Sequence, residues 1–133
     1  MRESIYNEMF PAGDKLKPLE IMYENGRISF KVYINAIQTG STDSGNGRDM
    51  LILYTWIMAE FTPIKSANMR HSSYALKHVF EKMHNGFYIT NDEFKTAMRD
   101  CGFVPVDEKE LNWHFYISQR STAVRRLGRG EWL

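Results

Sequence analysis

Apolar and polar residues largely alternate along residues 19–34, LEIMYENGRISFKVYI, on both sides of Asn25-Gly26. A two-residue turn at Asn25-Gly26 would place one wholly apolar face on a pair of antiparallel strands. The second face would carry two cross-strand pairs of opposite charge, a register that stabilises a hairpin. These pairs are Glu20 with Lys31 and Glu24 with Arg27. The pattern therefore predicts a β-hairpin over residues 19–34.

A helix through residues 30–37, FKVYINAI, is the alternative for the second half of this segment, and its β-branched residues argue mildly against it. The next segment, 38–49, is rich in Gly, Ser, Thr, Asn and Asp, which predicts a mobile loop. No GK[ST] sequence follows its glycines, so a phosphate-binding loop is not indicated.

Residues 50–61, MLILYTWIMAEF, are apolar nearly all round and predict a buried helix. Asp49 would begin this helix and Pro63 would end it. A fully buried strand is the alternative, because periodicity alone does not distinguish the two. Residues 63–70 would then be a polar connector.

Two capped amphipathic helices are expected between residues 71 and 103. Ser72 or Ser73 can cap the first, and Asn91 the second. Asn85-Gly86 and Gly102 would end them. The predicted inward residues of the first helix are Tyr74, Leu76, Val79, Phe80 and Met83, and those of the second are Phe94, Ala97, Met98 and Cys101.

Residues 112–118, NWHFYIS, alternate well enough to predict a final strand that joins the hairpin. The fold class expected is α+β, with a small antiparallel sheet packed on about three helices. A length of 133 residues suits a single domain, 1–133, ending in a basic tail, 119–133.

Charge and composition favour a surface that binds a protein over one that binds nucleic acid. The formal net charge is +1, which argues against nucleic-acid binding by the chain as a whole. Residues 1–64 carry six Lys or Arg against eight Asp or Glu, and residues 65–133 carry eleven against eight. The aromatic content of 14% and eight Met suggest that bulky side chains also form an exposed patch for a protein partner.

The cysteine content and the apolar runs indicate a cytoplasmic protein. The single cysteine, Cys101, cannot form an internal disulfide. The longest apolar run, 50–59, is too short to span a bilayer, and the first residues lack the apolar core of a signal peptide. No membrane partner is expected.

No catalytic or metal-binding pattern stands out. A zinc site would have to gather the four histidines with Cys101, and none has the spacing of a known ligand pair. Ser72, Ser73 and Cys101 are the candidate nucleophiles, and helix capping or core packing explains them better. We expect no enzyme activity, no metal and no cofactor. The histidines are His71, His78, His84 and His114.

The candidate binding site consists of cations and one aromatic ring on the two helices and in the tail. Lys95 and Arg99, four positions apart, share a helix face, and with Tyr88 they would present cations beside a stackable ring. A merely solvated face explains them equally well. The full set of candidate partner-binding residues is Lys77, His78, Lys82, Tyr88, Lys95, Arg99, Arg120, Arg125 and Arg126.

Three strings within residues 72–118, SSYALKH..E, GFYITNDEFKTAM...GF and NWHFYIS, resemble the motif of a family of small uncharacterised proteins from bacteriophages and mobile elements. The resemblance implies an accessory protein that inhibits or redirects host machinery, as anti-CRISPR and other anti-defence proteins do. It assigns no catalytic residue. The function expected is a non-enzymatic inhibitor that docks on a host protein or nucleoprotein complex. The alternative is a nucleic-acid-binding regulator that uses residues 71–103 and the Arg-rich tail.

Overall fold

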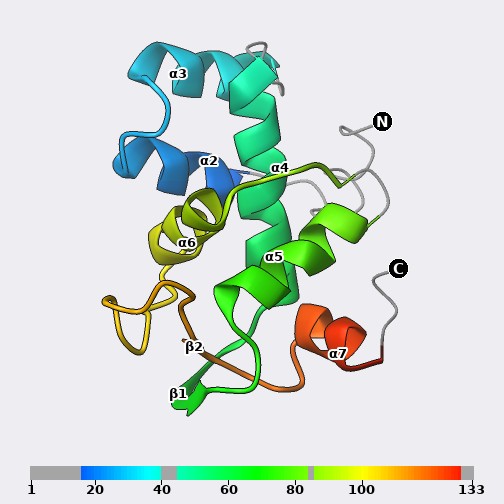
Figure 1. The fold of residues 1–133 in the computed structure, drawn as a ribbon. Helices are drawn as coiled ribbons and strands as arrows, with labels where there is room; N and C mark the ends of the chain where they lie inside the picture. The colour runs from blue at the N-terminus through cyan, green and yellow to red at the C-terminus, as the bar shows by residue number, and fades with distance from the viewer. Residues whose placement is uncertain (1–15, 40–44, 84–85, 130–133) are drawn as a thin grey trace. The chain divides into compact units, whose positions relative to one another are not determined.

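The structure is a computed structural model that describes residues 16–39, 45–83 and 86–129. These residues form six helices and one two-stranded antiparallel sheet (Figure 1), which confirms the α+β class. The chain divides into two compact units, Met1–Ala59 and Glu60–Leu133, which we describe separately. The prediction of a single domain over residues 1–133 stays a prediction.

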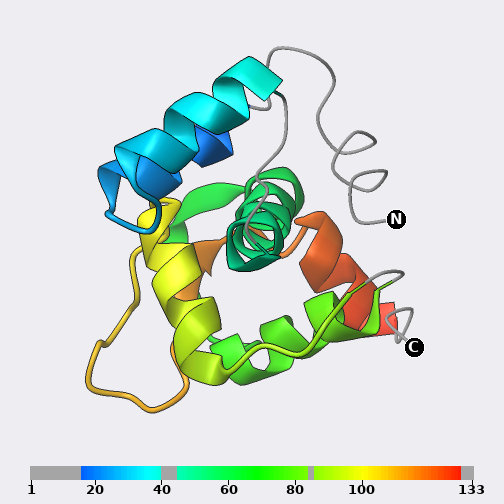
Figure 2. The same ribbon diagram turned by 90° about the horizontal axis from the view of Figure 1, so that it is seen from above.

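The first unit contains two consecutive helices where the sequence predicts a hairpin. Helix α2 spans Leu16–Glu24 and helix α3 spans Phe30–Thr39, and the two pack side by side (Figure 2). The hairpin prediction is therefore wrong, and the alternative of a helix through residues 30–37 is confirmed. The rings of Tyr23 and Tyr33 stack with centroids 4.9 Å apart, so the two helices also meet through aromatic side chains.

Gly26 explains why the hairpin prediction failed. Its φ of 73° lies in the left-handed region that the predicted turn also requires, but here it ends a helix. The N–H of Gly26 donates to Tyr23 O (3.0 Å) and that of Arg27 to Met22 O (2.8 Å). These two bonds satisfy the last carbonyls of α2, as in a Schellman motif. An Asn-Gly pair between apolar segments therefore predicts a left-handed glycine, but it does not show whether a strand or a helix comes before that glycine.

Replacing Gly26 with Val is expected to lower the free energy of unfolding by about 1–2 kcal/mol, because a β-branched residue is strained at positive φ. An added Cβ would meet no atom within 4 Å, so the cost is conformational and not steric. Urea denaturation measures it. Gly26→Asn is the matched control, since Asn tolerates positive φ. Equal losses of stability for both variants would contradict a left-handed Gly26 at the end of α2.

Helix α4 spans Gly45–Glu60 and confirms the prediction of a buried helix rather than a strand. Every residue from 51 to 57 is buried. The helix begins four residues before Asp49, inside the predicted loop 38–49, so the expected start at Asp49 is wrong. Positions 38 and 39 of the predicted loop belong to α3, so the loop prediction is wrong there too, and positions 40–44 lie outside the described residues.

The second unit holds the two capped helices that the sequence predicts. Helix α5 spans Ser73–Lys82 with Ser72 as its N-cap, and helix α6 spans Asn91–Asp100. The cap of α6 is Thr90, not Asn91: the Thr90 hydroxyl accepts from Glu93 N, and the Glu93 carboxylate accepts from Thr90 N. This is a capping box, whose T-x-x-E spacing is present in the sequence.

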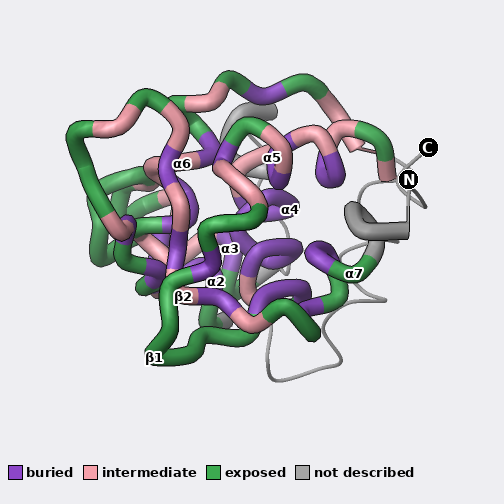
Figure 3. The backbone as a smooth tube through the Cα atoms, turned by 60° about the horizontal axis from the view of Figure 1, so that its bottom comes forward, coloured by how far each residue is buried: buried purple, intermediate pink, exposed green. Residues whose placement is uncertain are grey.

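Strand β1 spans Pro63–Asn68 and strand β2 spans Phe115–Ile117, paired antiparallel. The strand predicted near 112–118 is confirmed, but its partner is the segment expected to be a polar connector. Helix α7, Thr122–Arg129, follows β2, and α5 packs against both α6 and α7. The buried residues of β2 and of α5 and α6 form the core of this unit (Figure 3).

Candidate functional site

A carboxylate on α5 gathers the ammonium of Lys77, the imidazole of His78 and one backbone amide. Glu81 Oε2 accepts from Lys77 Nζ at 3.1 Å and from the N–H of Ile89 at 3.0 Å. Its other oxygen lies 2.9 Å from His78 Nδ1. Lys77 and His78 are four and three positions before Glu81, so the helix itself brings them together. The Ile89 contact fastens the segment that follows α5 onto the same helix.

The pKa of Glu81 reflects this environment. Burial by itself would raise the pKa, but the hydrogen bond from Ile89 and the bond and charge of Lys77, aided by His78, outweigh it. The pKa therefore lies below its ordinary value of 4.5. Glu81 is ionised at neutral pH, and its negative charge neutralises the buried ammonium of Lys77 beside it.

Two tyrosine rings contact the Lys77 ammonium. Lys77 Nζ lies 5.3 Å from the ring centroid of Tyr74 and 5.2 Å from that of Tyr88, both within the range of cation–π attraction. Lys77 is 4% exposed, whereas Tyr74 and Tyr88 are 52% and 76% exposed. The expectation that Tyr74 points inward is therefore wrong, and Lys77, a candidate partner-binding residue, is buried. We call Tyr74 and Tyr88 the tyrosine pair.

A second network ties the start of both helices to the segment before β2. The Ser73 hydroxyl donates to Asn91 Oδ1 (2.8 Å) and accepts from the N–H of Trp113 (3.0 Å). The N–H of Ser73 donates to Trp113 O at 2.7 Å. Asn91 Nδ2 donates in turn to Leu111 O and to Asn112 Oδ1. These bonds fix the orientation of α5 relative to α6 and so hold the tyrosine pair on a rigid support.

Lys95 and Arg99 share a face of α6, as predicted, but the ring beside them belongs to Trp113 and not to Tyr88. Lys95 Nζ and Arg99 Cζ each lie 4.7 Å from the centroid of a Trp113 ring. Lys95 Nζ also donates to Leu111 O at 2.9 Å, and its side chain is 12% exposed. Lys95 is therefore largely covered by its neighbours, whereas Arg99 is exposed.

The other candidate residues lie at the end of α5, just before α7 or on α7. Lys82 is exposed on the last turn of α5. Arg120, just before α7, and Arg125, on α7, are both exposed. Arg126 belongs to α7, but its side chain is outside the described part of the structure. The assignment of the nine residues as a partner-binding site stays a prediction.

The candidate nucleophiles serve structural purposes. Ser72 caps α5, and Ser73 is fully buried with its hydroxyl engaged on both sides. Burial raises the pKa of Cys101 to about 12, with a further contribution from the charge of Asp100. The thiol is therefore protonated at neutral pH and is a poor nucleophile. Among the described residues, no three His, Cys, Asp or Glu side chains are grouped so that they could hold a metal ion.

The sequence reasoning missed Glu81 and Trp113 as organising residues. Glu81 could have been found, because Lys77-x₃-Glu81 is a spacing that supports an ion pair on a helix. Trp113 could not have been found, because only the fold brings its ring into contact with Lys95 and Arg99 of α6. Both residues fall within the three motif strings, and so do Ser73, Lys77, Tyr88 and Asn91.

Comparisons of the chain with protein-family models, with curated proteins and with solved structures each find no match. The resemblance of residues 72–118 to phage and mobile-element proteins therefore stays a prediction. None of the helices in the described residues is long and apolar enough to cross a bilayer.

Proposed function

We propose that this chain is a non-enzymatic binding module that docks on a partner protein through the tyrosine pair. The observation that carries the proposal is the contact of two exposed rings with one buried ammonium. With the motif resemblance, it supports a partner in the host cytoplasm, either a protein or a nucleoprotein complex, that the chain inhibits.

Tyrosine is well suited to this role. Its ring offers a large contact area at a low cost in side-chain entropy, and its hydroxyl can bond to a polar partner. Here the cation–π contacts with Lys77 limit the rotation of both rings before any partner arrives. Binding anchors that are ordered in advance lose less entropy on association and so contribute more to affinity.

The distribution of charge favours a protein partner over nucleic acid. A phosphate backbone is bound by cations that are free to replace counterions. Lys77 is paired with Glu81, and Lys95 is held by Leu111 O and Trp113, so two of the predicted cations already have internal partners. The nucleic-acid-binding regulator remains the alternative, with Lys82, Arg99, Arg120 and Arg125 as its exposed cations.

Photo-crosslinking tests the proposal. A photoreactive phenylalanine analogue at position 88 is expected to capture a specific host protein from nuclease-treated lysate, whereas the same analogue at position 111 is not. Leu111 is a matched control because it is 77% exposed, like Tyr88 at 76%. Capture that depends on intact nucleic acid would favour the alternative function.

The purified partner allows a quantitative test. Tyr74→Ala with Tyr88→Ala is expected to weaken its binding by about tenfold or more, because exposed anchoring tyrosines are typical hot spots. Leu111→Ala should leave the affinity unchanged. Isothermal titration calorimetry measures both, and equal affinities for the two variants would place the binding site elsewhere.

A further inference from the structure

Strand β1 is an exposed sheet edge with an unusual register. Pro63 pairs with Ile117 and Asn68 pairs with Phe115, so four residues of β1 lie opposite Tyr116 alone. One residue offers one N–H and one C=O, and therefore Tyr116 cannot satisfy the backbone groups of residues 64–67. Residues 63–67 are all exposed, as the green colour of β1 shows (Figure 3). Among the described residues, β2 is the only strand that pairs with β1.

The other side of β2 is already covered. Phe115 forms a bridge with Pro105, and the N–H of Val106 donates to His114 O at 2.8 Å. The open edge of this sheet is thus that of β1. Open edges bind extended chains through backbone hydrogen bonds, and adjacent pockets that accept side chains give specificity.

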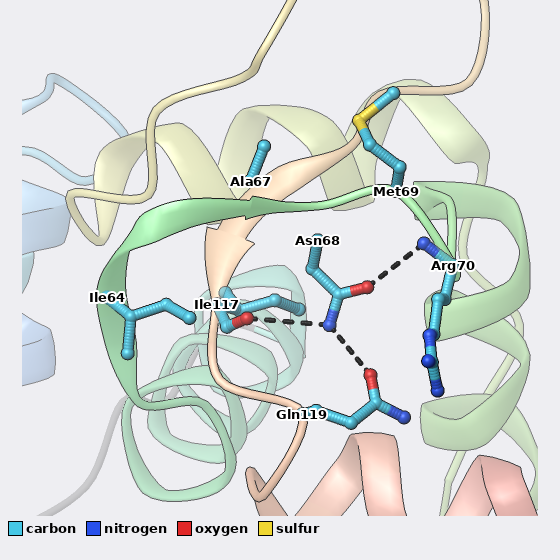
Figure 4. Close-up of a pocket in the computed structure, with 7 residues that line it drawn as sticks. All are labelled: Ile64, Ala67, Asn68, Met69, Arg70, Ile117 and Gln119. Atoms are coloured by element: carbon cyan, nitrogen blue, oxygen red, sulfur yellow. Dashed lines mark hydrogen bonds between the residues drawn. The ribbon is translucent and has the colours of Figure 1, made fainter.

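A pocket of about 460 Å³ adjoins this edge (Figure 4). Ile64, Met69 and Ile117 supply its apolar lining, and Asn68, Arg70 and Gln119 its polar lining. The Asn68 amide is fixed: Nδ2 donates to Gln119 Oε1 (3.0 Å) and to Ile117 O (3.4 Å), and Oδ1 accepts from Arg70 N (3.1 Å). The floor of the pocket is therefore rigid and ready to receive a side chain.

The stretches of chain that form the pocket and its neighbouring elements contain basic residues and no acidic ones. No Asp or Glu occurs in residues 61–80 or 111–130, the two stretches that contain β1, β2 and α7. Lys65, Arg70, Arg120 and Arg125 are exposed within them. In the described part of the chain, no carboxylate lies within ion-pair distance of the Arg70 guanidinium at the pocket. Electrostatic complementarity therefore selects an acidic partner.

We infer that the edge of β1 and its pocket bind an extended acidic peptide segment by strand addition. The peptide backbone pairs with residues 64–67, one apolar side chain enters the pocket, and neighbouring carboxylates meet Lys65 and Arg70. This surface is separate from the tyrosine pair and does not depend on the function proposed for it. A nucleic acid would share the charge but would use neither the backbone pairing nor the apolar pocket.

The probes are acetylated peptides of about six residues that alternate glutamate with valine, isoleucine, leucine or phenylalanine. Titrated into the isotopically labelled full chain, at least one is expected to shift the NMR amide signals of Ile64 to Asn68 in a saturable manner. Methylation of alternate peptide nitrogens on the pairing edge should weaken binding by about tenfold, since backbone hydrogen bonds are lost. Replacement of the apolar residues by serine should do the same.

Protein variants complete the test. Arg70→Gln should weaken peptide binding by about threefold, whereas Lys82→Gln, the same change on α5, should have no effect. Tyr74→Ala with Tyr88→Ala should also have none, which separates this surface from the tyrosine pair. The inference is overturned if no peptide shifts the β1 amides, if N-methylated and parent peptides bind equally, or if a single-stranded oligonucleotide binds β1 more tightly than every peptide.

Discussion

Replacing Ser73 with Ala is expected to lower the free energy of unfolding by about 3 kcal/mol, although the change removes a single oxygen atom. The hydroxyl is fully buried, and it connects the N–H of Trp113 to the Asn91 amide oxygen. Without it, the buried N–H of Trp113 loses its acceptor and the half-buried Asn91 side chain loses a donor. Such unsatisfied groups cost more than the hydrogen bonds contribute. Equilibrium urea unfolding measures the loss.

Ser72→Ala is the matched control at the adjacent position. Ser72 caps α5 and is only half-buried, so its loss should cost about 1 kcal/mol, the usual effect of an N-cap. A Ser73→Ala loss no larger than that of Ser72→Ala would show that water replaces the hydroxyl, and the network between the two helices would then be weaker than its geometry implies.

The sequence predicted elements well where a single helix face is buried. The stripe of α6 and the apolar core of α4 follow from periodicity, because burial of one face or of all faces leaves a direct trace in the residue pattern. Residues 19–34 failed because alternation and the Asn-Gly pair are shared by two structures. A left-handed Gly26 serves a hairpin turn and a helix end equally, and helix packing decided between them.

Strand β1 left no such trace. Its residues PIKSAN are exposed except for Asn68, so they show neither alternation nor an apolar run. The strand is defined by the pairing of Pro63 with Ile117 and of Asn68 with Phe115, about fifty residues later in the chain. Contacts over that distance are invisible to local pattern analysis.

The candidate site shows a similar division. The sequence identified Lys77, His78, Tyr88, Lys95 and Arg99 as polar residues of one region. In the structure, each of the five side chains contacts a charged or aromatic neighbour. The sequence could not show that Lys77 and Lys95 turn toward aromatic rings, because a Lys stem packs against apolar surface as readily as it extends into water. The exposed feature of this region is therefore the tyrosine pair, formed by Tyr74 of α5 and Tyr88 of the segment that follows, with both rings in contact with the buried ammonium of Lys77.

Glu81→Gln is expected to lower the free energy of unfolding at pH 7 by about 2 kcal/mol, because it leaves the buried Lys77 ammonium without its carboxylate. The loss depends on pH in a definite direction. The pKa of Glu81 is lowered on folding, so the carboxylate stabilises the folded chain above its ordinary pKa of 4.5. That contribution disappears as the pH falls through the lowered pKa. The unfolding free energies of the variant and the natural chain should converge below pH 4.5.

Lys77→Met provides the second arm of a double-mutant cycle. Methionine keeps the apolar stem beside Tyr74 and Tyr88 and removes the charge, so the double variant should lose less stability than the two single losses combined. The coupling should be present at pH 7 and absent below the pKa of Glu81. Additive losses at pH 7, or a Glu81→Gln effect that does not change with pH, would mean that the ion pair is solvated. The tyrosine pair would then lack the fixed cation that sets the orientation of its rings.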